Sequence, residues 1–555
     1  MKRIISLILV VIMMFSLAVP AFAGVSINET RSQIPVIRIS GDGDALYNQD
    51  GEKIFHFREI GSMLGGDEED EENSELMSSM ANVLLPFLVE GLLNDKWDNY
   101  YKNLEKEISE LFADARLDGN GNPVNGTGLS QHKANEVANN MKTDKKGNKG
   151  YYAHNDYWFW YDWRLDPLKT ADDFNDYIKA VKAVTGAEKV SILASCLGTS
   201  IVTAYVAKYG MDDIHGIGFD GSVVGGAEIL SETISGKFKV DGNAINRVLI
   251  DSTALGFFSV DSFVNTTIDM LTKTGILDTL VGVTKKELYY KVVEGVTSAL
   301  ALSTFYTWPT YWSAVSADDF DDAMLYVFGE EGSEKRKEYA GLIEQIENYD
   351  KVVRQNLESI LLSFKQSGAN VGIISKYGYQ ILPICESSDA VADQFASVKR
   401  SSFGATTSTI YNPLLDEYIG QRIIEGKEKY ISPDKQIDAS TCLYPDYTWF
   451  IKGSTHSNWS SYEMKILYDV ITADRQLTPE DFPWTQFMVY DTETDTLEAM
   501  TEENCDTELW EADESVDKPQ TKEERLSSAI KALLTWLFEL FKILSEKFEA
   551  SEIGR

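Results

Sequence analysis

Apolar and polar positions along the chain form two kinds of pattern, which alternate over most of its length. Short, nearly continuous apolar runs, which are typical of buried strands, come at residues 34–40, 157–161, 190–193, 214–219, 371–375, 379–383 and 448–451. Segments in which apolar residues recur every three or four positions predict helices at residues 75–115, 170–185, 201–209 and 462–471. Between residues 223 and 369 the pattern is mostly helical.

The stretch from residue 157 to residue 210 indicates the fold class. It has the pattern strand, helix, strand, helix with short connections, and such units build a parallel sheet covered by helices. We therefore predict an α/β fold with a mostly parallel central sheet flanked by helices and a large helical cap insertion. The predicted division is a first part of the core at 24–222 with a helical insertion at 58–150, a cap at 223–369, a second part of the core at 370–475, an acidic tail at 476–520 and an amphipathic helix at 521–555.

The junction between the strand at 190–193 and the helix after it carries the clearest candidate chemistry. Ala194 stands two positions before Cys196, and Gly198 stands two positions after it. A strand, a sharp turn and a helix with small flanking residues form a nucleophile elbow, whose turn is so tight that larger side chains would collide. Ser195 fits the centre less well, because leucines would then occupy the crowded positions. We predict Cys196 as the nucleophile.

A nucleophile at an elbow needs a base, and the base needs an acid that orients it. Only two of the five histidines, His215 and His456, follow Cys196 in the chain. His215 falls within a predicted strand, whereas His456 comes directly after the strand at 448–451. This elimination predicts His456 as the base.

The orienting acid is expected in the loop after the predicted strand at 379–383. Asp389 lies a few residues past that strand, far enough for the loop to turn back over the sheet. Glu386 and Asp393 are alternatives in the same loop. We predict Asp389 as the acid.

The strand at 34–40 ends in the glycine-rich turn Gly41-Asp42-Gly43. A glycine loop after an early strand supplies part of the oxyanion hole when an elbow follows downstream, and an ordinary turn is the alternative interpretation. With Cys196 at such an elbow, we predict the backbone N–H groups of Asp42 and Leu197 as the oxyanion-hole donors.

Together these motifs resemble the α/β-hydrolase superfamily, in the branch of lipases and esterases that is similar to lecithin:cholesterol acyltransferase. The resemblance rests on four places: Ser40–Gly43, the sequence Tyr-Asp-Trp-Arg at 161–164, the elbow, and the acid and histidine loops. It implies hydrolysis of an acyl ester, or acyl transfer, through a covalent acyl-enzyme, with a small-molecule acyl ester or a lipid as substrate. The family nucleophile is serine, so Cys196 is a departure, and a catalytically degenerate hydrolase that acts as a surface binding protein is the alternative function.

The charge and the first residues bear on partners and location. A formal net charge of −36 argues against a nucleic-acid partner and against electrostatic docking on anionic lipid. Residues 1–23 have the basic start, apolar run and Ala-Phe-Ala end of a signal peptide, and no later run is long and apolar enough to span a bilayer. We expect a secreted, extracellular protein, with association to a cell surface left open.

The remaining features predict no bound group. Four cysteines are too few for a disulfide scaffold, and Cys385 and Cys442 either pair or remain thiols. The acidic run at 67–72 and the turn at 118–123 lack the ligand spacing of a calcium site, so we expect neither a metal nor a cofactor.

The helix predicted at 523–548 has one apolar face. Docking on the domain or self-association is favoured over contact with lipid, because the lysines of this helix are offset by glutamates.

Overall fold

A computed structural model of the chain describes most of the region between residues 34 and 505. The described residues are 34–41, 43, 45–55, 87, 90–91, 96–129, 156–239, 241, 244, 285–410, 412–458, 461–482, 485–491 and 494–505. The predicted signal peptide, the acidic run at 67–72 and the predicted final helix lie outside these residues.

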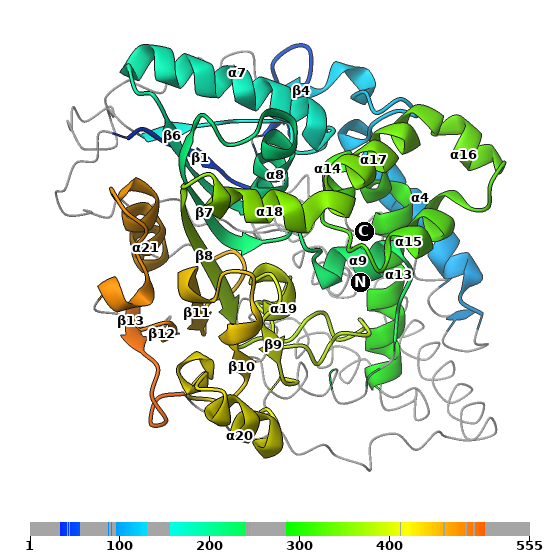
Figure 1. The fold of residues 1–555 in the computed structure, drawn as a ribbon. Coiled ribbons are helices and arrows are strands. Elements are labelled where there is room, and N and C mark those ends of the chain that lie inside the picture. The colour runs from blue at the N-terminus through cyan, green and yellow to red at the C-terminus, as the bar shows by residue number, and fades with distance from the viewer. Residues whose placement is uncertain are drawn as a thin grey trace, which may run out of the picture.

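The centre of the fold is an eight-stranded sheet with the strand order β13-β12-β11-β8-β7-β6-β1-β5 (Figure 1). All neighbouring strands run parallel except β12 and β13. This confirms the predicted α/β fold with a mostly parallel sheet. The strands are β1 (Val36–Ile39), β5 (Asp156–Trp158), β6 (Val190–Cys196), β7 (Ile214–Ser222), β8 (Asn370–Tyr377), β11 (Thr448–Lys452), β12 (Phe487–Asp491) and β13 (Thr496–Ala499).

Helices cover both faces of the sheet, because the inner strands are apolar on both sides. On one face α7 (Pro167–Thr185), α8 (Gly198–Tyr209) and α18 (Leu357–Gln366) share a core with Ile192 of β6. On the other face α21 (Ser461–Thr472) packs with Leu193, the next residue of the same strand. Close packing of α21 requires glycine in β7, since a Cβ atom on Gly216 would lie 2.4 Å from the backbone oxygen of Ile471.

The two helices beside β6 both end at a glycine, and α7 also begins at a side-chain cap. The carboxylate of Asp166 accepts a hydrogen bond from the backbone N–H of Leu168, and Pro167 occupies the first helical position. Both features favour a helix start here, ahead of the predicted start at residue 170. The helices end at Gly186 and Gly210, which adopt positive φ values of 72° and 74°.

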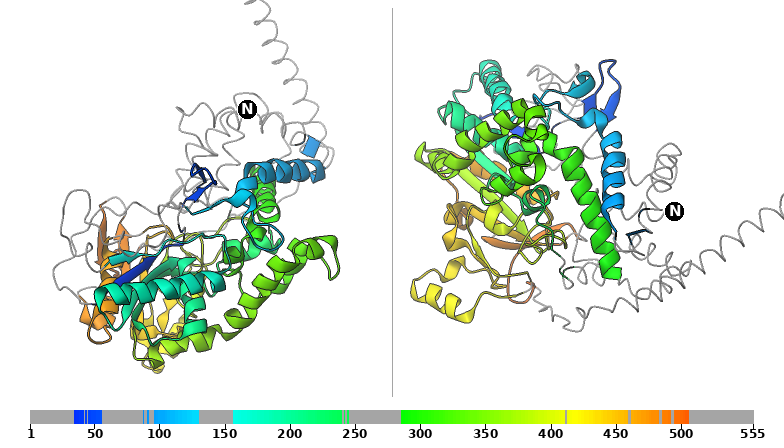
Figure 2. Two further views of the ribbon diagram at one scale, coloured as in Figure 1. Left: turned by 90° about the horizontal axis from the view of Figure 1, so that it is seen from above. Right: turned by 90° about the vertical axis from the view of Figure 1, so that its right-hand side faces the viewer.

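The described residues between β7 and β8 are mostly helical, as the sequence pattern predicts. Figure 1 shows these helices together at one side of the sheet, and Figure 2 shows the long helix α13 alongside α4. The indoles of Trp308 and Trp312 are buried here, and Trp308 packs edge-on against Trp163 with ring centroids 4.7 Å apart. These aromatic residues therefore belong to the hydrophobic core that the helical region shares with the sheet. The helices are α9 (Glu228–Ile234), α13 (Lys285–Ser303), α14 (Pro309–Trp312), α15 (Phe320–Phe328), α16 (Glu334–Glu338) and α17 (Ala340–Val352).

The sheet continues past residue 475, where the sequence pattern placed the end of the core. Strand β12 pairs parallel with β11, with Phe450 opposite Phe487, and β13 closes this edge antiparallel to β12. Phe487 and Met488 are buried, so the apolar run of β12 outweighs the acidic composition around it.

The remaining described elements lie outside the main sheet. They include the helices α4 (Asp98–Leu111), α19 (Val398–Ser401) and α20 (Asp416–Ile424). Two small sheets are formed by β2 (Leu46–Tyr47), β3 (Lys53–Phe55) and β4 (Gly128–Leu129), and by β9 (Thr406–Thr407) and β10 (Ile437–Asp438).

None of the helices that the structure describes has the length and apolar character of a bilayer-spanning segment.

Candidate active site

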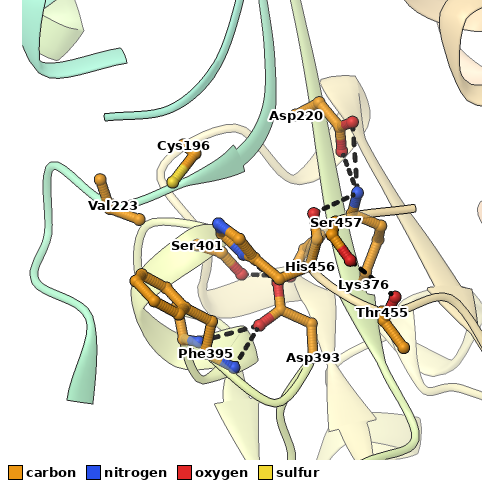
Figure 3. Close-up of polar contacts among 12 residues, drawn as sticks. Cys196, Asp220, Val223, Lys376, Asp393, Phe395, Ser401, Thr455, His456 and Ser457 are labelled. Carbon is orange, nitrogen blue, oxygen red and sulfur yellow. Dashed lines mark hydrogen bonds and ion pairs between the residues drawn. The ribbon is translucent and has the colours of Figure 1, made fainter. Parts of the chain in front are cut away.

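Three loops at the carboxyl edge of the sheet bring the candidate side chains together (Figure 3). Cys196 ends β6, His456 lies in the loop after β11, and Asp393 lies in the loop after β8. Because these strands are parallel, their carboxyl ends meet at one edge, which is the usual location of ligand sites in open α/β sheets. All three side chains are buried, with relative exposures of 6% for Cys196, 5% for His456 and 0% for Asp393.

Cys196 occupies a sharp turn between β6 and α8, as the elbow pattern predicts. Its φ angle is +48°, which L-residues other than glycine, asparagine and aspartate rarely adopt. The turn is packed against the strand end at 39–41: a Cβ atom on Gly198 would lie 2.6 Å from the backbone oxygen of Ile39, and one on Gly41 would lie 2.5 Å from Cβ of Cys196. The hydroxyl of Thr199 donates a 2.6 Å hydrogen bond to the backbone oxygen of Cys196. The strained turn is therefore enforced from several sides.

The glycine loop after β1 lies directly against this turn. The Tyr161 hydroxyl donates to the backbone oxygens of Ser40 and Gly41, at 2.8 and 3.2 Å. Tyr161 opens the Tyr-Asp-Trp-Arg motif, so that motif fixes the loop beside the elbow. A Cβ atom on Gly41 would also lie 2.9 Å from the backbone nitrogen of Leu197, which places this predicted oxyanion-hole donor beside the loop. The other predicted donor, Asp42, lies outside the described residues.

The imidazole of His456 is held by the loop after β8. Its Nδ1 atom lies 2.7 Å from Oδ2 of Asp393, and its backbone N–H donates to the backbone oxygen of Asp393 at 2.9 Å. The second carboxylate oxygen of Asp393 accepts hydrogen bonds from the backbone N–H groups of Phe395 and Ala396, at 3.0 and 2.8 Å. The ring of Phe395 stacks on the imidazole with centroids 4.6 Å apart. Position and orientation of the ring are therefore both fixed.

The surroundings of His456 and Asp393 favour the charged form of each side chain. Burial alone would lower the pKa of His456, but the Asp393 carboxylate and the Cys196 side chain outweigh it and raise this pKa to about 10. Burial alone would raise the pKa of Asp393, but the charge and hydrogen bond of His456 lower it. The Cys196 side chain points toward the imidazole (Figure 3), while Nε2 lacks a partner in full hydrogen-bond geometry among the described residues. Such contacts in unliganded sites commonly tighten only when a substrate is bound.

The structure places Asp393, rather than the predicted acid Asp389, beside His456. Asp389 is exposed, and its backbone oxygen, not its carboxylate, is the group that contacts Ile410. The alternative Glu386 is also exposed, whereas the alternative Asp393 contacts His456. The physical reason is that residues 379–383 form no sheet strand, so the chain leaves the sheet after β8 and the loop to the acid is longer than predicted.

One signal in the sequence does favour Asp393. Apolar residues flank it at positions 391, 392, 395 and 396, whereas a serine precedes Asp389. A carboxylate within an apolar segment is expected to be buried, and a buried carboxylate needs a partner. That signal identifies a buried acid, but it does not identify the histidine that it pairs with.

Other candidates lie apart from this site. His215 contacts the backbone oxygen of Ala473 at 2.9 Å, near the start of β7, and its exclusion as the base agrees with that position. Cys385 and Cys442 are free, buried thiols. No group of histidine, cysteine, aspartate or glutamate side chains suited to a metal ion occurs within the part of the chain that the structure describes.

Sheet order, elbow and loops define the chain as an α/β protein with a mostly parallel sheet, helices on both faces and helices between β7 and β8. Comparison with known proteins found no matching family model and no matching curated sequence. Among solved structures, a chain of the crystal structure of the Tle4–Tli4 complex is similar at 13% sequence identity and a TM-score of 0.23, over 62% of this chain and 75% of that one. A likeness this distant carries no argument about activity.

Proposed function

We propose that the protein is a secreted acyl-ester hydrolase or acyltransferase in which Cys196 is the nucleophile, His456 the base and Asp393 the orienting acid. The supporting observation is the buried imidazole, which contacts a carboxylate through Nδ1 and has the thiol of a strained elbow on its other side. Nucleophile, base and orienting acid in this order are the parts that acyl transfer requires. The substrate is a small-molecule acyl ester or a lipid.

In the first half of the reaction the sulfur of Cys196 attacks the carbonyl carbon of the ester. His456 takes the thiol proton before the attack, and the resulting imidazolium gives it to the departing alkoxide, so that an alcohol leaves and the acyl group remains on sulfur as a thioester. Asp393 stabilises the imidazolium and holds the ring in one orientation. The raised pKa of His456, about 10, favours the protonated ring that delivers this proton.

In the second half an acceptor attacks the thioester carbonyl. His456 removes a proton from water or from an acceptor alcohol, the new carbon–oxygen bond forms, and the sulfur of Cys196 leaves and regains its proton. Water gives a free acid and an alcohol gives a new ester. The backbone N–H groups of Leu197 and Asp42 would hold the oxyanion in both halves, and each donor of this kind contributes about 3–4 kcal/mol of transition-state stabilisation.

The direct test is acyl-enzyme formation on Cys196. Purified protein is incubated with p-nitrophenyl esters of several chain lengths, and release of p-nitrophenol and the intact mass are both followed. We expect turnover and an acyl adduct in the wild type, neither in Cys196→Ala, and both in the control Cys505→Ala, which removes a buried thiol from a different hydrophobic cluster.

A second reagent separates an inactive site from a wrong substrate. Iodoacetamide should alkylate Cys196 faster in the wild type than in His456→Ala, whatever the natural ester is. If the wild type is inert on all esters and Cys196 is never labelled, the enzyme proposal fails and the degenerate binding protein becomes the better account.

Export is a separate part of the proposal and rests on residues 1–23 alone. Expression of the full chain in a secreting host should yield extracellular protein that begins at Gly24. Protein that stays inside the cells with Met1 intact would contradict it.

A further inference from the structure

A second pair of buried charges lies beside His456, at the ends of two central strands. Lys376 stands one residue before the end of β8, and Asp220 stands near the end of β7. Both side chains have a relative exposure of 0%. The Nζ atom of Lys376 is 3.1 Å from Oδ1 of Asp220, and Figure 3 shows this pair beside His456.

The ammonium group of Lys376 also holds the loop that carries His456. It donates to the backbone oxygen of His456 at 3.1 Å and to that of Asn458 at 2.6 Å. An ammonium has three donors, and Asp220 with these two oxygens provides three partners. The loop carbonyls on either side of Ser457 are therefore fixed to one charged atom that is anchored in the sheet.

The rest of the loop is fixed by neutral or acidic groups. The Ser454 hydroxyl donates to Glu463 at 2.6 Å, and the Asn458 amide donates to the Ser454 hydroxyl at 3.1 Å. These contacts hold the two ends of the loop, whereas Lys376 contacts the backbone of His456 itself. Lys376 is thus the side chain whose loss would displace the backbone of His456 most directly.

Stability alone does not account for this arrangement. Burying two charges carries a large desolvation penalty, and apolar replacements of a buried ion pair are often neutral or stabilising. From this geometry we propose that Lys376 and Asp220 are positioning residues: Lys376 sets the height and angle of the His456 backbone relative to Cys196, and Asp220 neutralises and aims the Lys376 ammonium. The inference rests on the proposed function of Cys196 and His456.

The test compares single and paired substitutions. Lys376→Met removes the ammonium and leaves Asp220 buried without its ion partner, whereas the double variant Lys376→Met/Asp220→Asn removes both charges. The control is Lys452→Met, because Lys452 also ends a strand, next to β8, and also pairs with a buried aspartate, Asp434, at 3.2 Å. Each variant is assayed for kcat, KM, urea unfolding and the rate of Cys196 alkylation by iodoacetamide.

We expect the double variant to remain folded while kcat falls 10- to 100-fold, KM stays within threefold, and alkylation at pH 7 slows at least fivefold. Lys452→Met should keep kcat and the alkylation rate within twofold, whatever its unfolding midpoint. Equal kcat and equal alkylation rates in the double variant and the wild type would overturn the inference, even if Lys376→Met alone fails to fold. If no ester is turned over, the alkylation rates of Cys196 still decide. If alkylation is equally fast with and without His456, both the proposed function and this inference are refuted. If alkylation depends on His456 but not on Lys376, only the inference is refuted.

Discussion

The two sides of the candidate site are built by different physical means. On the nucleophile side, Cys196 is held in a positive φ by backbone atoms and glycines that leave no space for another conformation. On the base side, His456 and Asp393 lie in loops that are held by hydrogen bonds and buried charges. Steric confinement fails abruptly when one atom is added, whereas a polar network weakens by steps as single partners are removed. Substitutions on the nucleophile side should therefore remove activity abruptly, whereas substitutions on the base side should reduce it in steps.

The nucleophile side should show the largest effect. A Cβ atom on Gly41 would lie 2.5 Å from Cβ and 2.9 Å from Sγ of Cys196, so Gly41→Ala must displace the elbow. We expect ester hydrolysis to fall below detection, and the free energy of unfolding to drop by about 1–3 kcal/mol, as for other overpacked sites. Hydrolysis rates and urea unfolding measure both effects.

The matched control for this substitution is Gly420→Ala. Gly420 lies in α20, where an added Cβ atom meets nothing within 4 Å, so activity should be unchanged and stability should rise by up to about 1 kcal/mol. Steric confinement of the elbow would be the wrong account if Gly41→Ala kept more than a tenth of wild-type activity.

The acid on the base side should show the second largest effect. Asp393→Asn keeps the shape of the side chain but removes the charge beside Nδ1, so we expect kcat to fall by about 10³–10⁴-fold with the fold retained. Asp389→Asn changes an exposed carboxylate in the same loop and should leave kcat within twofold. Steady-state kinetics on one ester decide between them, and the opposite ranking would restore Asp389 as the acid.

The same contrast explains what the sequence could and could not predict. The elbow is local, because its strand, its small residues and the helix that ends at Gly210 follow one another in the chain. Cys196 and its turn can therefore be predicted from one short segment. His456 could be found by elimination, because few histidines follow the nucleophile. The parallel sheet also follows from local alternation of strands and helices.

The acid could not be assigned in this way, because its position depends on the path of a loop. Residues 379–383 have an apolar pattern that resembles a strand, but they lie outside the sheet. The loop that leads to Asp393 therefore begins after β8, and not after residue 383 as the pattern predicts. The contact of Asp393 with His456 joins residues that are 63 positions apart. A related reason applies to β12 and β13, because pairing of β12 with β11 and of β13 with β12 decides their structure and local acidity does not.

A smaller effect should come from Tyr161, whose hydroxyl contacts the glycine loop beside the elbow. Tyr161→Phe removes the hydroxyl that binds the backbone oxygens of Ser40 and Gly41, so the loop beside Leu197 should become less well ordered. We expect kcat to fall about tenfold and stability by about 1 kcal/mol, the usual contribution of one hydrogen bond. Tyr177→Phe is the control, because its hydroxyl makes a similar 2.9 Å bond to the backbone oxygen of Trp158 away from the site. Equal losses of kcat in both variants would show that the effect is not specific to the loop.

A further effect should be seen in stability alone, as a function of pH. The pKa of His456 is raised to about 10 in the folded chain, above the value of about 6.5 for an unfolded histidine. A group of this kind stabilises the fold fully below its unfolded pKa, and the contribution is lost as pH rises from about 6.5 toward 10. The free energy of unfolding of the wild type should therefore decrease over this window, by at most about 1.4 kcal/mol per pH unit for one proton, relative to His456→Gln. His215→Gln, which changes a histidine near the start of β7, should keep the wild-type slope. Parallel curves for the wild type and His456→Gln would mean that the imidazole is neutral in the resting protein, and His456 would then act as a base that takes up its proton only when the thiol attacks.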